Sequence, residues 1–319
     1  MTTTLVTPSP RTRREPTPRV TAKAGAALHR PWWMPWLWCA PAIAAAVVFG
    51  VFPFLNTVLL SFTNARPLGG PAAFVGLENY TRLLGDASFW SATWHSVLYA
   101  LVVVPLMVLL PLLLAVLVEK RIPFIGFFRS AFYTPVLASI IVVGFSWQWL
   151  LRDDGLINGV LLATGLTTEA VPFLSEATLV LFGAMAMTVW KGLGWYMVLY
   201  LAALGNVPKE LHEAASVDGA SAPRRFLHVT VPGVRPTMLL VGTLTAIGSL
   251  RVFTEVYALG GATGGPGGEA RTLPFYIRDV GLDPVTGNAG FGAAASVALF
   301  LLTVGFTVLG QRISRGEGR

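Results

Sequence analysis

Three ionisable residues lie within long apolar stretches of this sequence, Lys191, Arg251 and Glu255. A charge at the centre of a membrane helix costs ~2.5–3.5 kcal/mol on insertion scales, so it needs a partner or a water-filled surrounding. Arg251 and Glu255 are four residues apart and would share one face of a single helix. Two roles fit them. One is an internal ion pair that orients helices, formed by Glu255 with Lys191 or Arg251, and the other is the polar lining of a solute path.

The stretch around Lys191 reads T-V-W-K-G-L-G-W-Y-M. Thr188, Gly192 and Trp195 are spaced at i, i+4 and i+7, which places them on one helical face. Small residues beside aromatic rings, Trp190 included, would leave room for a flat ligand such as a sugar ring. Glycines in membrane helices also serve close packing, and tryptophans mark membrane interfaces. A solute-binding face and a packing face therefore both fit this stretch.

Side chains that could catalyse a reaction are not brought together by the sequence. None of the four lysines is followed by Ser or Thr, so a G-x-x-x-x-G-K-S/T phosphate loop for ATP is absent. His212-Glu213 lacks the second histidine of a zinc-protease helix, because Ser216 stands at that spacing. The single cysteine, Cys39, excludes an intrachain disulfide. We expect no catalytic residue, metal site or cofactor in this chain.

The elements that must position these residues are membrane helices. Of the 319 residues 54% are hydrophobic and 12% charged, against about 25% charged in soluble domains. The sequence predicts an all-α polytopic membrane protein with six transmembrane helices, each near the ~20 residues that cross a bilayer. The predicted spans are 36–62, 93–118, 130–151, 178–204, 237–259 and 291–310. Residues 1–35 and 313–319 are predicted to be tails of a membrane domain that covers 36–312, the first of them disordered.

The basic residues predict the orientation of this domain. Sixteen lie in the tails and in the loops 119–129 and 205–236, and five lie in the loops of the opposite side. Because cytoplasmic loops carry the excess of Lys and Arg, both termini and the 205–236 loop are expected in the cytoplasm. The net charge of +7 is therefore a signal of topology and gives no reason to expect binding to nucleic acid.

The 210–236 segment is a polar island between two apolar runs. Its helix-forming residues are interrupted at Gly219, after which Ser221 is suited to cap a second helix. Pro232 and Pro236 are expected to end that second helix. We predict two short helices joined by a bend at the membrane surface, a shape that fits a docking element.

The spacing E-A-A-x-x-D-G-A-x(5)-F-x(5)-P in this segment resembles the cytoplasmic EAA loop in permeases of bacterial ATP-binding-cassette (ABC) importers. It is most similar to the carbohydrate-uptake branch, the maltose and glycerol-phosphate type. The residues that carry the pattern are Glu213, Ala214, Ala215, Asp218, Gly219, Ala220, Phe226 and Pro232. Further similarity in F-V-G-L-E-N-Y, R-V-F-T-E-V-Y-A-L and F-G-A-A-A-S-V-A-L-F extends the resemblance over most of residues 36–312.

The resemblance implies the type I ABC importer permease fold, with a coupling loop at 206–236. It implies a heterodimer with a second permease, two ATPase subunits that hold ATP and Mg, and an extracytoplasmic solute-binding protein, in the bacterial cytoplasmic (inner) membrane. Glu213 would meet a basic residue of the ATPase, Gly219 would permit the bend, and Ala214 and Ala215 would allow close contact.

In the maltose importer the helix before this loop contributes to the sugar site, and Trp190, Gly192 and Trp195 match residues of that site. The resemblance thus favours a solute path lined by Thr188, Trp190, Lys191, Gly192, Trp195, Arg251 and Glu255. The positive charge of Lys191 is also compatible with a charged or phosphorylated solute. The expected function is import of a sugar, oligosaccharide or sugar-like solute. The alternatives are a permease of another ABC class, for amino acids or phosphate, and a polytopic membrane enzyme that acts on lipid.

Overall fold

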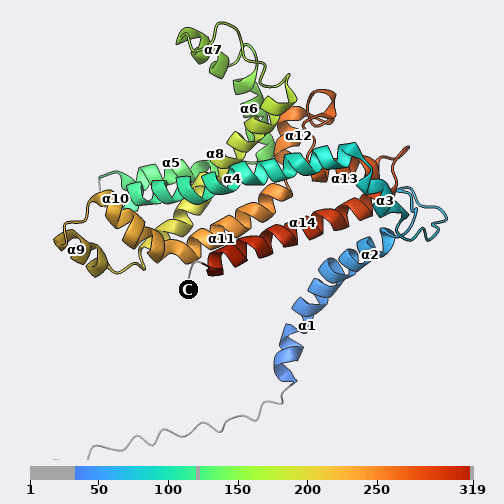
Figure 1. The fold of residues 1–319 in the computed structure, drawn as a ribbon, viewed down its shortest axis with the longest axis horizontal. Helices are drawn as coiled ribbons and strands as arrows, with labels where there is room; N and C mark the ends of the chain where they lie inside the picture. The colour runs from blue at the N-terminus through green and yellow to red at the C-terminus, as the bar shows by residue number, and fades with distance from the viewer. Residues whose placement is uncertain (1–32, 120–122, 317–319) are drawn as a thin grey trace, which may run out of the picture. The chain divides into compact units, whose positions relative to one another are not determined.

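The computed structural model describes residues 33–119 and 123–316, and this part of the chain is almost entirely helical (Figure 1). Its β-structure is limited, among those residues, to one antiparallel bridge between Thr63 and Phe74. In chain order the elements are α1 (Met34–Ala46), the π-helical turn η1 (Val47–Val51), α2 (Phe52–Leu60), α3 (Glu78–Leu84), α4 (Ala87–Glu119), α5 (Ile125–Leu137), α6 (Ile140–Leu151), α7 (Leu156–Ala163), α8 (Ala177–Leu204), α9 (Lys209–Val217), α10 (Ala222–Arg225), the π-helical turn η2 (Phe226–Thr230), α11 (Val231–Leu250), α12 (Thr254–Gly260), the 3-10 turn η3 (Pro266–Gly268), α13 (Leu273–Leu282) and α14 (Ala289–Gly316).

Five helical stretches are long and apolar enough to cross a membrane: Met34–Leu60, Ala87–Glu119, Ala177–Leu204, Ala222–Leu250 and Ala289–Arg312. The bent pair Ile125–Leu137 and Ile140–Ala163 provides a sixth if it counts as one span. The predicted all-α membrane fold is confirmed, and so are the first, second, fourth and last spans, although α4 begins six residues earlier than expected. Within the first span the π-helical turn η1 ends two residues before Pro53, whose missing N–H interrupts the regular hydrogen bonding.

Two predicted spans are broken, so the expectation of continuous helices over 130–151 and 237–259 was wrong. The first bends by 100° between α5 and α6, because Pro135 removes a backbone donor in the last turn and Ala138 is extended (ψ 140°). The second stops at Leu250, where α11 ends, and resumes at Thr254 as α12. Its last turn contains Gly248 and Ser249, both weak helix formers.

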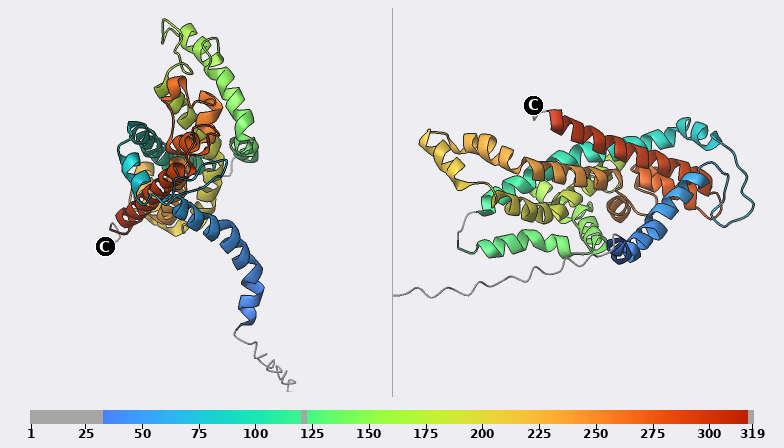
Figure 2. Two further views of the ribbon diagram at one scale, coloured as in Figure 1. Left: turned by 90° about the vertical axis from the view of Figure 1, so that its right-hand side faces the viewer. Right: turned by 90° about the horizontal axis from the view of Figure 1, so that it is seen from below.

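The helices α4, α8 and α11 form the centre of the bundle, with α5 against α8 and α14 against α11 (Figures 1 and 2). A cluster of buried apolar side chains joins α4 and α8 to α12 and α13, and it includes Tyr99, Val103 and Met107 of α4 and Met185 of α8. A second cluster, around Leu112, Met197 and Val234, lies nearer the α9–α10 end. Both clusters join helices that are far apart in the sequence.

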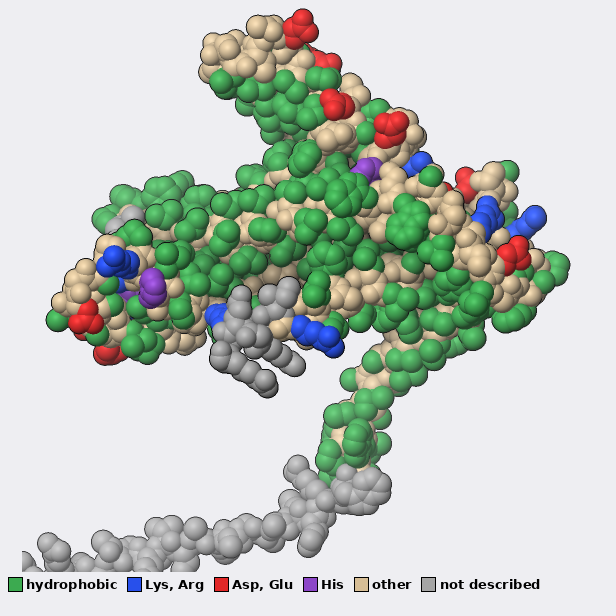
Figure 3. Space-filling view, in the orientation of Figure 1, with side chains coloured by type: hydrophobic (Ala, Val, Ile, Leu, Met, Phe, Trp, Pro, Cys, Tyr) green, Lys and Arg blue, Asp and Glu red, His purple; other side chains and the backbone are tan. Residues whose placement is uncertain are grey.

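The two ends of the bundle are polar, whereas most of the face between them is hydrophobic (Figure 3). One end carries α9 and α10, and the other carries α3 and α13 (Figures 1 and 2). The F-V-G-L-E-N-Y segment leads into α3. Its buried Asn79 donates hydrogen bonds to the carbonyl oxygens of Ser61 (2.9 Å) and Thr63 (2.8 Å), which fastens α3 to the segment after α2.

Candidate functional site: a helical loop and a polar cavity

The loop after α8 begins with α9 at one end of the bundle (Figure 1). Pro208 is the N-cap residue and Glu210 lies in the first turn, near the positive end of the helix dipole. Glu213 and Ala214 are exposed and Ala215 is half-buried. An apolar side chain is exposed too, since Val217 keeps 88% of its surface. The helix thus offers acidic, small and apolar groups to a partner.

The bend between the two helices is a Schellman motif. Gly219 has φ +76°, the left-handed conformation that glycine adopts without penalty. Its N–H donates to Ser216 O (3.1 Å), and the N–H of Ala220 donates to Ala215 O (2.9 Å), which are the two bonds of this motif. The predicted break at Gly219 is therefore confirmed. Ser221 is the N-cap of α10, but its hydroxyl makes no capping hydrogen bond.

The second short helix does not end at Pro232 and Pro236, and that expectation was wrong. Ala222–Leu250 is one helical stretch in which α10 passes through η2 into α11. Pro232 is the second residue of α11 and lies inside this continuous stretch, where the wide π turn before it makes room for the proline ring. Phe226 packs against the second core cluster. The loop is thereby continuous with a membrane helix.

A cavity of about 300 Å³, open on one side, lies against α8 and is bordered by α4, α5, α6 and α12; we call it the polar cavity after Thr188, Lys191 and Glu255 in its wall. Five of the seven residues expected on the solute path line it: Thr188, Lys191, Gly192, Trp195 and Glu255. The others in its wall are Met107, Val136, Ile140 and Tyr196. Sequence reasoning missed these four, because three of them come from α4 and from the two sides of the α5–α6 bend. No motif in the sequence points from those segments to α8.

The side chain of Lys191 is hydrogen-bonded to the C-terminal end of α5, next to the bend between α5 and α6. Its ammonium group donates to the carbonyl oxygens of Val136 (3.2 Å) and, at the limit of hydrogen-bond distance, Pro135 (3.5 Å). These carbonyls belong to the last turn of α5, which ends at Leu137. A cation at a helix C-terminus satisfies carbonyls that have lost their helical partners and also fits the negative end of the dipole. Lys191 therefore ties α8 to α5.

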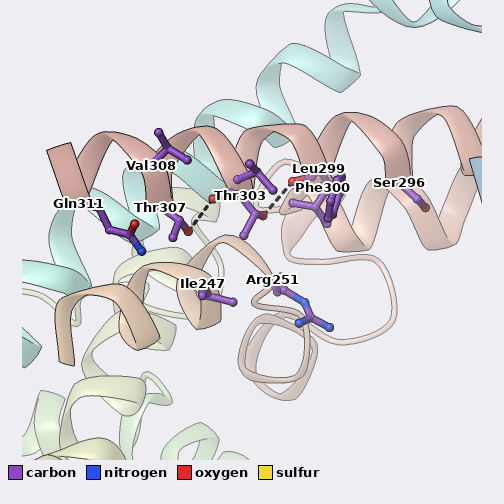
Figure 4. Close-up of a pocket in the computed structure, with 10 residues that line it drawn as sticks. Ile247, Arg251, Ser296, Leu299, Phe300, Thr303, Thr307, Val308 and Gln311 are labelled. Carbon is purple, nitrogen blue, oxygen red and sulfur yellow. Dashed lines mark hydrogen bonds between the residues drawn. The ribbon is translucent and has the colours of Figure 1, made fainter. Parts of the chain in front are cut away.

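Glu255 and Arg251 are separated by the break after α11, so the face that they were expected to share does not exist. Glu255 lies in the first turn of α12 and lines the polar cavity. Arg251 is the C-cap residue of α11, is exposed, and lines a different cavity of about 590 Å³ against α14 (Figure 4). That cavity also contains the hydroxyl groups of Ser296, Thr303 and Thr307.

The remaining residues of the α8 face divide between the cavity and packing. A Cβ atom on Gly192 would collide with Met107 Cε, the end of a flexible side chain, so this glycine makes room for Met107 between α8 and α4. Trp190 does not line the polar cavity, and its ring lies 6.1 Å from that of Trp147. The distance between those ring centroids is typical of an aromatic pair.

One more residue missed by the sequence is Tyr99, which is fully buried in α4. Its hydroxyl donates to Ala184 O (2.9 Å) and lies 2.6 Å from Thr188 Oγ1. Because the single phenolic proton is used on the carbonyl, the hydroxyl of Thr188 donates to Tyr99. The oxygen of Thr188 is thereby left as an acceptor at the cavity wall.

Comparison with known proteins gives these features a context. Residues 156–317 match the family model described as "Binding-protein-dependent transport system inner membrane component". The chain is 32% identical over 290 residues to the arabinooligosaccharides transport system permease protein AraP of Bacillus subtilis (strain 168), covering 89% of this chain and 90% of that protein. It is 33% identical over 246 residues to the lactose transport system permease protein LacF of Rhizobium radiobacter, covering 77% of this chain and 82% of that one.

The fold has a solved counterpart in the bacterial alginate ABC transporter, determined in complex with an alginate pentasaccharide-bound periplasmic protein. A chain of that structure matches with a TM-score of 0.75 at 19% sequence identity, over 89% of this chain and 94% of that chain. The present chain belongs to the family of binding-protein-dependent transport system inner membrane components. It is a multi-pass membrane protein with the fold of an ABC importer permease.

Proposed function

We propose that this chain is a permease subunit of an ATP-driven importer that carries a sugar, an oligosaccharide or a sugar-like solute across the bacterial cytoplasmic membrane. The observation behind the proposal is the presence, in one chain, of the polar cavity against α8 and of an exposed loop with the E-A-A-x-x-D-G-A spacing at the end of the bundle. Both relatives are named for sugar transport, which favours a carbohydrate over an amino acid or phosphate.

The cavity offers groups that suit a solute with many hydroxyls. The carboxylate of Glu255 and the hydroxyl oxygen of Thr188 accept hydrogen bonds, and Trp195 provides an apolar ring face. Lys191 directs its ammonium group to backbone carbonyls of α5. The cavity is therefore less cationic toward a solute than the lysine alone would make it, which favours a neutral sugar over a phosphorylated one.

The loop fits transmission of force from a separate ATPase. In this proposal two ATPase subunits hold ATP and Mg, a second permease completes the membrane domain, and an extracytoplasmic binding protein delivers the solute. The termini and the α9–α10 loop face the cytoplasm, in accord with the distribution of basic residues. Closure of the ATPase dimer then moves α9 and α10, and η2 passes the motion directly into α11. In this proposal the separate subunits hydrolyse ATP, and this chain contributes transport and coupling.

Purification of the chain from its native membrane tests the proposal. We expect a second permease and an ATPase to copurify, and ATP turnover in the reconstituted assembly to rise when a solute-binding protein loaded with the correct sugar is added. A chain that purifies without an ATPase and converts lipid by itself would contradict the proposal and would favour a membrane enzyme. Stimulation by amino acids or phosphate in place of sugars would correct the solute class.

A further inference from the structure

The coupling loop contains a notch that the E-A-A pattern does not explain. It has a volume of about 340 Å³ and is lined by Ala215, Ala220, Arg224, Arg225, His228 and Val229. The two alanines, Arg225 and Val229 are half-buried, whereas Arg224 and His228 are exposed. The inner part of the notch is therefore lined mainly by small side chains, and its outer part is lined by the basic side chains of Arg224 and His228. A helix, ~10–12 Å wide with its side chains, is too large to enter, but a single side chain fits.

Two of the three basic side chains have defined roles within the loop. Arg225 Nη1 donates to Ala220 O (3.0 Å) and to Ser216 Oγ (3.3 Å), so it braces α10 against the end of α9. His228 Nδ1 lies 3.0 Å from Arg224 O and must donate to it, since a carbonyl oxygen only accepts. The brace fixes the notch, and the guanidinium of Arg224 is the exposed cation at its mouth.

We propose that this notch receives a carboxylate side chain of the ATPase subunit and that Arg224 binds it. The inference rests on the proposed function, in which the ATPase contacts α9. The notch is continuous with that contact, because Ala215 and Ala220 belong both to the E-A-A pattern and to the notch lining. A guanidinium pairs with a carboxylate through two parallel hydrogen bonds, which fixes orientation as well as position.

The charges of the loop give the partner surface a definite pattern. α9 exposes the acids Glu210 and Glu213, whereas the notch exposes Arg224. A complementary ATPase surface presents a basic group toward α9 and an acidic group toward the notch. A contact that uses charges of both signs on each surface fixes the register of the loop on its partner, because a shifted placement brings like charges together.

The test compares two charge reversals in the complete importer, Arg224→Glu and Lys209→Glu. Lys209 is an exposed residue of the same loop that does not line the notch, so both variants change the net charge equally. The ATPase that copurifies with the chain is titrated onto the permease pair in nanodiscs at low and high salt. We expect Arg224→Glu to weaken ATPase binding at least ~tenfold and to reduce its salt dependence, and Lys209→Glu to change it less than ~threefold.

Equal weakening by both variants, or none by Arg224→Glu, overturns the proposal. If Arg224→Glu has no effect while Glu213→Lys still abolishes ATPase binding, the notch is unused and the proposed function stands. If the wild-type assembly binds no ATPase, both fall together. The titration is repeated in nanodiscs with and without phosphatidylglycerol. An effect of Arg224→Glu seen only with this lipid assigns the notch to an anionic headgroup and likewise overturns the contact with the ATPase.

Discussion

The α9–α10 loop and the polar cavity are specified by the chain in different ways. The hydrogen bonds that shape the bend lie between residues no more than five apart, from Ala215 to Ala220. The cavity wall instead draws on residues between Met107 and Glu255, which lie on five helices. The loop is therefore a local structure, and the cavity is a product of tertiary packing.

Because of this difference, the two regions are expected to be sensitive to different kinds of substitution. A local bend depends on the backbone conformation of very few residues, so one substitution there can misplace a whole exposed helix. A cavity bordered by several helices depends on how closely those helices approach, so its shape changes when a packing residue or a tie between helices is lost. Substitutions matched in chemistry but different in place separate the two cases.

The largest effect is expected at the bend. Gly219→Ala forces a residue with a Cβ atom into φ +76°, which costs roughly 1–2 kcal/mol, and the strain is relieved by moving α9. Solute-stimulated ATP turnover of the reconstituted importer should fall at least ~tenfold, while the amount of chain in the membrane stays the same.

Gly205→Ala is the control for that substitution. Gly205 ends α8 with φ −61°, and an added Cβ would make ordinary contacts with Ala202 O (3.6 Å) and Leu201 O (3.7 Å). ATP turnover should therefore remain within ~twofold of the wild type. Similar losses in both variants would mean that the bend has no special role.

In the cavity the corresponding comparison uses two tryptophans of one helix. Trp195 lines the cavity and Trp190 packs beside Trp147, although 49% and 43% of their respective surfaces are exposed. Trp195→Ala should lower solute import ~tenfold, a change of about 1.4 kcal/mol, and Trp190→Ala no more than ~twofold. Uptake of labelled sugar into vesicles measures both. A larger loss at Trp190 would place the solute outside this cavity.

Much of the loop could be predicted because its determinants are adjacent in the sequence. The break at Gly219 and the N-cap position of Ser221 follow from residue types alone. The expectation for Pro232 was wrong because the π turn η2 accommodates this proline within a continuous helical stretch. Residue types alone do not distinguish a proline that ends a helix from one that a π turn accommodates.

The cavity could be predicted only in part. The i, i+4, i+7 spacing predicted one wall of the cavity, formed by Thr188, Gly192 and Trp195. The breaks after Leu137 and Leu250 were missed, because a proline or glycine in a membrane helix does not by itself predict a break: Pro105 and Pro111 lie within the unbroken helix α4. For the same reason Arg251 was grouped with Glu255, although the break directs it toward α14.

Loss of the tie between α8 and α5 should have an intermediate effect. Lys191→Met keeps the length of the side chain but removes the bonds to the carbonyls of Val136 and Pro135. Hydrogen bonds from a charged donor contribute about 1.5–3 kcal/mol, so the apparent unfolding temperature should fall by a few degrees and import by ~threefold to fivefold. Lys191→Arg keeps a donor and should recover most of the stability. If Lys191→Met is as stable as the wild type, the lysine serves the solute and not the helix.

The smallest effect is expected from the buried hydroxyl behind the cavity wall. Tyr99→Phe keeps the packed ring and removes the acceptor for the hydroxyl of Thr188. That hydroxyl then rotates freely at the cavity wall, so the KM for the solute should rise ~twofold to threefold with kcat unchanged, in line with one neutral hydrogen bond of ~0.5–1.5 kcal/mol.

Tyr200→Phe is the matched control, because Tyr200 is equally buried and donates to Val108 O (3.0 Å) without lining the cavity. A rise in KM for Tyr99→Phe alone would show that Tyr99 affects solute binding through Thr188, without touching the solute. An equal rise in both variants would show that the cavity responds to buried hydrogen bonds anywhere in the bundle.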